Sequence, residues 1–117
     1  MLVRNFLEAI LQEESNMHDG KGTTNHAQLF FNQDFKSNLR FINYTILTPG
    51  SSIGVHKHGN DEELYIVLEG NGIMTVDGEE KEVKAGDIIL NKPFGEHGLR
   101  NNSEHDLKIL VFEVGID

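Results

Sequence analysis

The chain has 117 residues and a formal net charge of −9, from 10 basic and 19 acidic residues. It contains no cysteine, which excludes disulfide bonds, thiolate metal sites and cysteine nucleophiles. The length fits a single domain, and the acidic balance argues against a nucleic-acid partner because phosphate binding needs a basic surface. The longest apolar run, residues 109–112, is far too short to span a bilayer, and no secretory signal pattern is visible, so we expect a cytoplasmic protein.

The first predicted element is an amphipathic helix over residues 2–14. Its apolar residues recur at helical spacing: Leu2, Val3, Phe6, Leu7, Ile10 and Leu11. No strong N-cap residue precedes them, so the helix would depend on docking its apolar face. The small and polar residues of 15–26 predict a connecting loop. We therefore expect an N-terminal helix and loop over residues 1–26, followed by the main domain over residues 27–117.

From residue 27 onward the pattern changes to short extended segments. The predicted strands cover residues 27–31, 39–47, 53–58, 63–69, 73–76, 80–83, 88–90, 96–100 and 106–114. Turn residues separate many of them, and Asp77-Gly78 is a favoured two-residue hairpin turn. Short strands at intervals of about ten residues are typical of an all-β sandwich or barrel. Nothing after residue 14 has a helical period, which argues against a parallel α/β fold.

Histidines provide the clearest indication of chemistry. His56 and His58 are two residues apart on a predicted strand, so both side chains point to the same face. Glu63 begins the next strand, and a turn over residues 59–61 could bring its carboxylate toward the two imidazoles. His97 lies on a later strand. Two imidazoles and a carboxylate are a metal-site pattern that a third imidazole strengthens.

These residues resemble the cupins over roughly residues 39–114. The first cupin motif, G-x5-H-x-H-x3-4-E-x6-G, is matched at every position by Gly50, His56, His58, Glu63 and Gly70. The second motif is G-x5-P-x-G-x2-H-x3-N, and it begins at Gly86. His97 and Asn101 stand at the expected distances, whereas the Pro-Phe-Gly of residues 93–95 lies one position closer to His97. The chain is therefore similar to small single-domain cupins, or monocupins.

The resemblance implies an all-β cupin fold, a double-stranded β-helix or jelly-roll barrel, over residues 27–117. It also implies one divalent metal bound by His56, His58, Glu63 and His97. Glu62 is a competing acid, but the six-residue gap to Gly70 favours Glu63. Nitrogen and oxygen ligands suit Mn, Fe, Co, Ni or Zn. Six-coordinate geometry would leave two positions open for chemistry, whereas tetrahedral zinc would leave none.

The surroundings of this site can be predicted only in part. Tyr65 has the parity of Glu63, so it is a candidate pocket residue, unless it only packs in the barrel. The sequence does not decide which face of residues 39–47 lines the pocket. Glu62 and Glu96 are the nearest candidates for a second acid, and no catalytic residue can be named. Three further histidines are expected at the surface: His18, His26 and His105.

The resemblance favours a metal-dependent enzyme acting on a small oxygen-rich molecule, such as a carboxylate, keto acid or sugar derivative. Oxygenase, decarboxylase and isomerase chemistry all occur in cupins. The alternatives are a non-catalytic binding module for a sugar or metabolite and a metal-stabilised structural protein. Residues 63–69 are apolar on both faces, so the N-terminal helix or a second subunit should cover the outer face. The resemblance favours a homodimer, and no nucleic-acid or membrane partner is expected.

Overall fold

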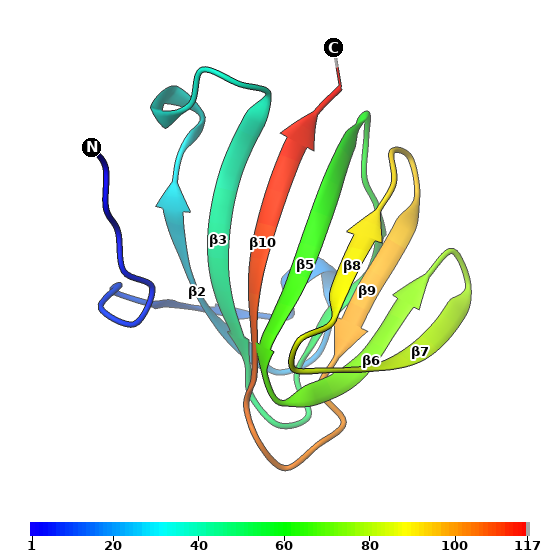
Figure 1. The fold of residues 1–117 in the computed structure, drawn as a ribbon. Helices are drawn as coiled ribbons and strands as arrows, with labels where there is room; N and C mark the ends of the chain where they lie inside the picture. Colours follow the sequence, from blue (N-terminus) through cyan, green and yellow to red (C-terminus); the bar gives the residue numbers. More distant parts are fainter. Residues whose placement is uncertain (117) are drawn as a thin grey trace.

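A computed structural model describes residues 1–116, and within them ten strands form two sheets that enclose the interior (Figure 1). The larger sheet has the order β1-β2-β3-β10-β5-β8 and the smaller has the order β4-β9-β6-β7. The strands are β1 (Gln12–Ser15), β2 (Thr23–Phe30), β3 (Leu39–Leu47), β4 (Ser52–Lys57), β5 (Asp61–Glu69), β6 (Asn71–Val76), β7 (Glu79–Lys84), β8 (Ile88–Asn91), β9 (Glu96–Arg100) and β10 (Leu107–Gly115). Two short 3-10 turns complete the elements, η1 (Met17–Asp19) and η2 (Asn32–Asp34). The all-β prediction is confirmed.

Every strand predicted after residue 27 is present, with ends that differ by a few residues. The hairpin of β6 and β7 shows why local sequence was sufficient here. Its central residues Asp77 and Gly78 have φ values of 47° and 84°, the two positive values that a tight hairpin turn of this kind requires. Val76 pairs directly with Glu79 across that turn.

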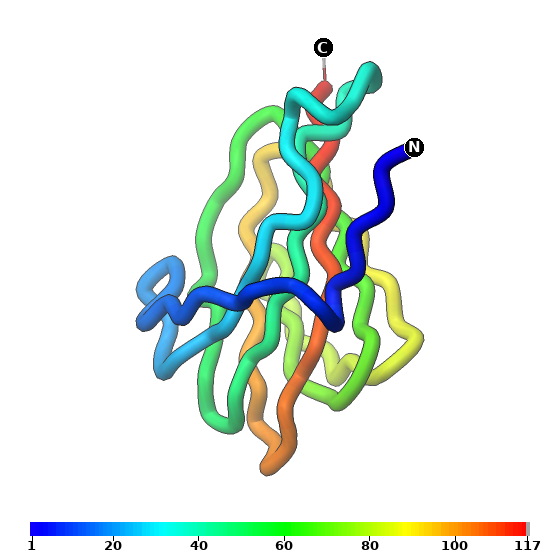
Figure 2. Tube along the Cα trace, turned by 90° about the vertical axis from the view of Figure 1, so that its left-hand side faces the viewer, coloured from blue at the N-terminus to red at the C-terminus, as the bar shows by residue number. Residues whose placement is uncertain are grey.

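The predicted N-terminal helix over residues 2–14 is wrong. Residues 1–11 form an irregular segment with one turn, and β1 pairs with β2 at the edge of the larger sheet. Figure 2 shows this segment, in blue, crossing the strands of the domain. Without an N-cap, a short helix has little stability of its own in water. Val3, Leu7 and Ile10 remain 79%, 75% and 91% exposed, so no docked apolar face stabilises a helix here.

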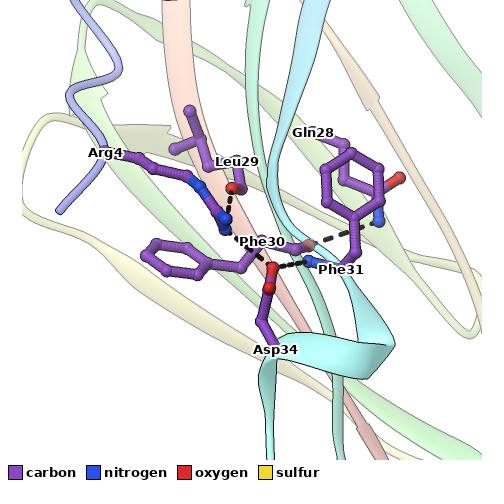
Figure 3. A network of polar contacts seen from close by, with 6 residues as sticks. All are labelled: Arg4, Gln28, Leu29, Phe30, Phe31 and Asp34. Carbon is purple, nitrogen blue, oxygen red and sulfur yellow. Dashed lines mark hydrogen bonds and ion pairs between the residues drawn. The ribbon is translucent and has the colours of Figure 1, made fainter. Parts of the chain in front are cut away.

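Two side chains anchor this N-terminal segment to the domain. Arg4 donates to the carbonyl of Leu29 at 2.9 Å and to Asp34 Oδ2 at 2.7 Å (Figure 3). Its guanidinium also lies 4.7 Å from the centre of the Phe30 ring. Further along the chain, the Phe6 ring packs against Tyr44 at a centroid distance of 4.8 Å. Long-range side-chain contacts therefore determine the path of residues 1–11.

The apolar core fills one end of the barrel, and the candidate site lies toward the other. Residues that are paired on β3, β10 and β5 lie side by side and form rows across the larger sheet. Leu47 and Leu107 form a row that is completely buried. Further along the same strands, Phe41, Glu113 and Glu63 form a more polar row. The other buried core residues are Ile53, Tyr65, Val67, Met74, Val83, Leu99, Ile109 and Val111.

The outer face of the larger sheet is apolar as well. Leu64 and Ile66 of β5 point away from the interior and are only half-buried. Beside them on β8, Ile88 and Leu90 are 64% and 48% exposed. Within residues 1–116, no helix is long and apolar enough to cross a membrane.

Candidate metal centre and ligand cavity

The two sheets bring the four predicted metal ligands together. His56 on β4 lies directly opposite His97 on β9, and Glu63 projects from β5 of the facing sheet. One ligand atom from each of these three residues lies within 4.8 Å of the other two. His58, just beyond β4, forms a second group of the same size with Asp61 and Glu63. Glu63 therefore belongs to both groups and links them into one cluster.

Hydrogen bonds leave a ring nitrogen of each histidine available. His56 Nδ1 lies 2.9 Å from the Gly54 carbonyl, and because a carbonyl only accepts, Nδ1 carries the proton and Nε2 has a free lone pair. His58 Nδ1 lies 3.1 Å from Asp61 Oδ1, while its Nε2 is buried without a partner among the described residues. His97 is 1% exposed, and neither of its ring nitrogens has a hydrogen-bond partner within residues 1–116.

Burial controls the protonation of the cluster. It lowers the pKa of His97 to about 3, and the neighbouring imidazoles of His56 and His58 act in the same direction. Burial also raises the pKa of Glu63 to about 7. The carboxyl oxygen of Glu63 is 3.7 Å from His97 Nε2. A neutral imidazole and a carboxyl group that ionises near neutral pH are both ready to accept a cation.

Two acids near the cluster were not identified from the sequence. Asp61 is buried, and although desolvation raises its pKa, its interactions with Glu113 and His58 hold that pKa below its ordinary value. Glu113 lies opposite Glu63 across β10 and β5. Burial, followed by the interaction with Asp61, raises the pKa of Glu113 to about 8. β10 is apolar at both parities, so only the structure shows that Glu113 shares the inward face with the buried Ile109 and Val111.

The cluster opens into a cavity of about 370 Å³. The side chains that line it include Met17, His18, His26, Phe41, Asn43, Thr45, Ile53, Lys57, Tyr65, Val111 and Glu113, besides His56, His58 and Glu63. Tyr65 is buried, as a pocket residue or a packed one would be, and its ring meets His97 edge to face at 5.4 Å. Neither Glu62 nor Glu96 is among the described residues that line this cavity.

His18 and His26 were expected at the surface, and His18 is exposed while His26 is half-buried, but both also line the cavity. His18 lies on η1, and its ring stacks on His56 with a centroid distance of 3.7 Å and an interplanar angle of 12°. Two glycines allow η1 to approach β4 this closely. A Cβ on Gly54 would lie 2.0 Å from the His18 carbonyl oxygen, and a Cβ on Gly20 would lie 2.2 Å from the Ser52 carbonyl oxygen.

The last residue of the second motif, Asn101, has a structural role. Its side-chain amide donates to the carbonyls of Leu47 at 2.9 Å and His105 at 2.7 Å. Its Oδ1 accepts hydrogen bonds from the backbone and side chain of Ser103. Asn101 therefore ties the turn between β9 and β10 to the end of β3. His105 itself is exposed on that turn, as expected.

Comparison with known proteins identifies the family. The family model described as "Cupin domain" matches residues 43–113. The chain belongs to the cupin family, and its relatives include small single-domain cupins.

One curated protein and one solved structure that resemble the chain come from Thermotoga maritima. The chain is 34% identical over 97 residues to an oxalate-binding protein, an alignment that covers 83% of this chain and 80% of that protein. A crystal structure described as a predicted oxalate decarboxylase has a TM-score of 0.94 and 32% identity, and covers 99% of this chain and 100% of that one. An uncharacterized protein of Methanocaldococcus jannaschii is 46% identical over 65 residues, covering 56% of this chain and 52% of that protein.

Proposed function

We propose that the chain binds one divalent transition metal through His56, His58, Glu63 and His97. The observation that carries this proposal is the convergence of three histidines, each with an available ring nitrogen, on one carboxylate inside a cavity. Unpartnered buried nitrogens are costly, and a metal would satisfy them. Asp61 would orient His58 from behind, as carboxylates commonly do for metal-binding histidines. The donor set suits Mn, Fe, Co, Ni and Zn.

We further propose that the cavity accepts a small oxygen-rich molecule, with short carboxylates such as oxalate as the first class to test. A cavity of about 370 Å³ is large enough for such a molecule. The names of the Thermotoga maritima relatives support this choice. A bound metal would supply Lewis-acid polarisation of the ligand oxygens. Tyr65 and Glu113 would contact the ligand from the walls of the cavity.

The favoured reaction is decarboxylation, for which the chain offers a proton donor. When the C–C bond of oxalate breaks and carbon dioxide leaves, the remaining carbon needs one proton to become formate. Glu113 lines the cavity beside Glu63 and is the acid placed to deliver that proton. Water would then return a proton to Glu113. The reaction consumes one proton for each oxalate and needs no external oxidant or reductant in its overall balance.

The alternative is a non-catalytic module that binds a sugar or metabolite in the same barrel. The name of the oxalate-binding relative favours this second function. Elemental analysis of natively purified protein shows whether a metal is bound and which one. The double variant His56→Ala with His97→Ala should lose the bound metal. Unchanged metal content in that double variant would refute the site. Oxalate that raises the melting temperature while carbon dioxide is released supports the enzyme, whereas the same shift without release supports the binding module.

We also propose that the chain forms a homodimer through the outer face of β5 and β8. Ile88 and Leu90 extend the half-buried apolar face of β5 to the sheet edge. A second copy would remove this surface from water, and stable interfaces bury about 800 Å² on each partner. Sedimentation should show a dimer that becomes a monomer in Leu90→Glu. A wild-type monomer at high concentration would exclude this assembly.

A further inference from the structure

Polar side chains of β2 and β3, on the side of the cavity away from β5, are not used by the proposed metal centre. His26 on β2 lies opposite Thr45 on β3, and Asn43 is the next inward residue along β3. In the larger sheet β10 separates β3 from β5. Neighbouring strands are about 4.8 Å apart, and Glu63 lies one row beyond the row of Asn43, so the backbones that carry Asn43 and Glu63 are separated by about 12 Å. These side chains therefore lie on the same sheet as Glu63, with β10 between them, and line the same cavity.

The polar atoms of this wall lack partners. His26 Nδ1 and Asn43 Oδ1 are both buried and have no hydrogen-bond partner among residues 1–116. The nearest charged group to His26 is Glu14, whose Oε2 lies 3.8 Å from Nδ1, beyond hydrogen-bond distance. Most buried polar atoms in proteins are paired, so two unpaired atoms on one cavity wall point to polar atoms that enter the cavity. A carboxylate only accepts, so the Asn43 amide would turn to present its Nδ2–H to it, and His26 would donate an N–H.

The floor between the two polar ends is different in character. Asn43, Val111 and Tyr65 form one row across β3, β10 and β5. The Val111 side chain and the face of the Tyr65 ring offer apolar surface between Asn43 and the cluster. The cavity is thus polar at its two ends with an apolar stretch between them. A molecule that matches this pattern has an oxygen-bearing group at each end of a short carbon chain.

We propose that His26 and Asn43 form a second polar subsite, which holds the end of a bound acid that lies away from the metal. This inference rests on the proposed metal-dependent binding of carboxylates. It assigns the preferred ligands to the short two-ended acids, with a second carboxylate or a similar oxygen-rich group at the far end. An acid as short as oxalate would sit at the metal without reaching this subsite.

Succinate and butyrate form a matched pair for the test, because both have four carbons and only succinate has a polar far end. Calorimetry on metal-loaded wild-type protein should show succinate binding at least tenfold more tightly than butyrate. Asn43→Leu and His26→Phe should each weaken succinate binding at least fivefold. Metal content and the affinities for butyrate and oxalate should stay unchanged. Asn25→Leu and His105→Phe are the controls. Asn25 is next to His26 on β2 and so points to the opposite face of the sheet, and His105 is exposed on a distant turn.

The possible results separate the two proposals. Equal affinity of wild-type protein for succinate and butyrate would overturn the subsite without any variant having to fold. Variants that keep full succinate affinity would overturn it as well, and so would variants that lose metal, because His26 and Asn43 would then serve the metal centre. A wild-type protein that binds no metal, or binds metal but none of the acids, would refute the proposed function, and the subsite would fall with it.

Discussion

A methyl group added at Gly54 should separate η1 from β4 and disturb the metal centre. The new Cβ would lie 2.0 Å from the His18 carbonyl oxygen and 2.8 Å from the Gly20 backbone nitrogen. Close carbon–oxygen contacts begin at about 3.3 Å, so the backbone of η1 would have to move by roughly 1.3 Å. Neither neighbour is a flexible side chain that could turn away. Overpacking of this kind costs about 1–3 kcal/mol of unfolding free energy.

This cost should be measurable in two ways. For a domain of this size, each kcal/mol corresponds to about 4 °C in melting temperature, so Gly54→Ala should melt about 4–12 °C below wild type. The His18 ring stacks on His56, and the Gly54 carbonyl accepts the His56 Nδ1 proton, so metal affinity should also fall. Loss of such supporting contacts typically weakens metal binding about 10–100-fold. Differential scanning calorimetry and metal titration give the two numbers.

Gly59→Ala is the matched control for this experiment. Its Cβ would meet nothing closer than Asp61 Oδ1 at 4.0 Å, and its backbone does not have a positive φ. A glycine replaced without strain leaves stability unchanged or raises it by about 0.4–1 kcal/mol. The reasoning fails if Gly54→Ala and Gly59→Ala melt together, or if Gly54→Ala binds metal as wild type does.

Four further predictions test the centre and the core. Glu113→Gln should leave metal content and oxalate binding intact while carbon dioxide release falls about 100-fold or more, because a positioned proton donor contributes about 10²–10⁴ in rate; undiminished release would exclude Glu113 as the donor. Metal can bind only after Glu63 loses its proton, and because its pKa is about 7, apparent affinity in calorimetry should fall as pH drops below 7, by about tenfold for each pH unit. A flat profile between pH 5 and 7 would contradict this. In metal-free folded protein, the pKa values of Glu63 and Glu113 are about 7 and about 8, whereas in the unfolded chain both carboxyl groups lose their protons near 4.5. The folded chain therefore binds more protons over this range, and its stability should fall from pH 5 to pH 8. His97 acts in the opposite direction between about 3 and 6.5. The fall in stability should therefore be shallow near pH 5, steepest around pH 6.5 and shallower again toward pH 8, and urea unfolding of wild type and of Glu63→Gln with Glu113→Gln should differ in this slope. Leu47→Ala, at a fully buried position, should cost about 2–5 kcal/mol, and a loss below 1 kcal/mol in urea unfolding would contradict its place in the core.

Local patterns in the sequence were enough for most of the barrel. Short extended segments bounded by turn residues identified each strand predicted from residue 27 onward, because such local patterns need no knowledge of neighbouring strands. Asp77-Gly78 specified its own turn through backbone conformation. The cupin motif spacing selected the histidines and Glu63, and the structure places them in two neighbouring groups that share Glu63.

Only the tertiary structure decided which element packs against each face of a strand, because local sequence leaves this open. It turned residues 12–15 into an edge strand, because pairing with β2 was available and a helix without a cap or a docked face was not stable. Strand register placed Asn43 and Glu113 inside the barrel. The approach of η1 to β4, made possible by Gly20 and Gly54, brought His18 onto His56. A sequence carries the period of its strands, but contacts between distant strands determine what surrounds a metal centre.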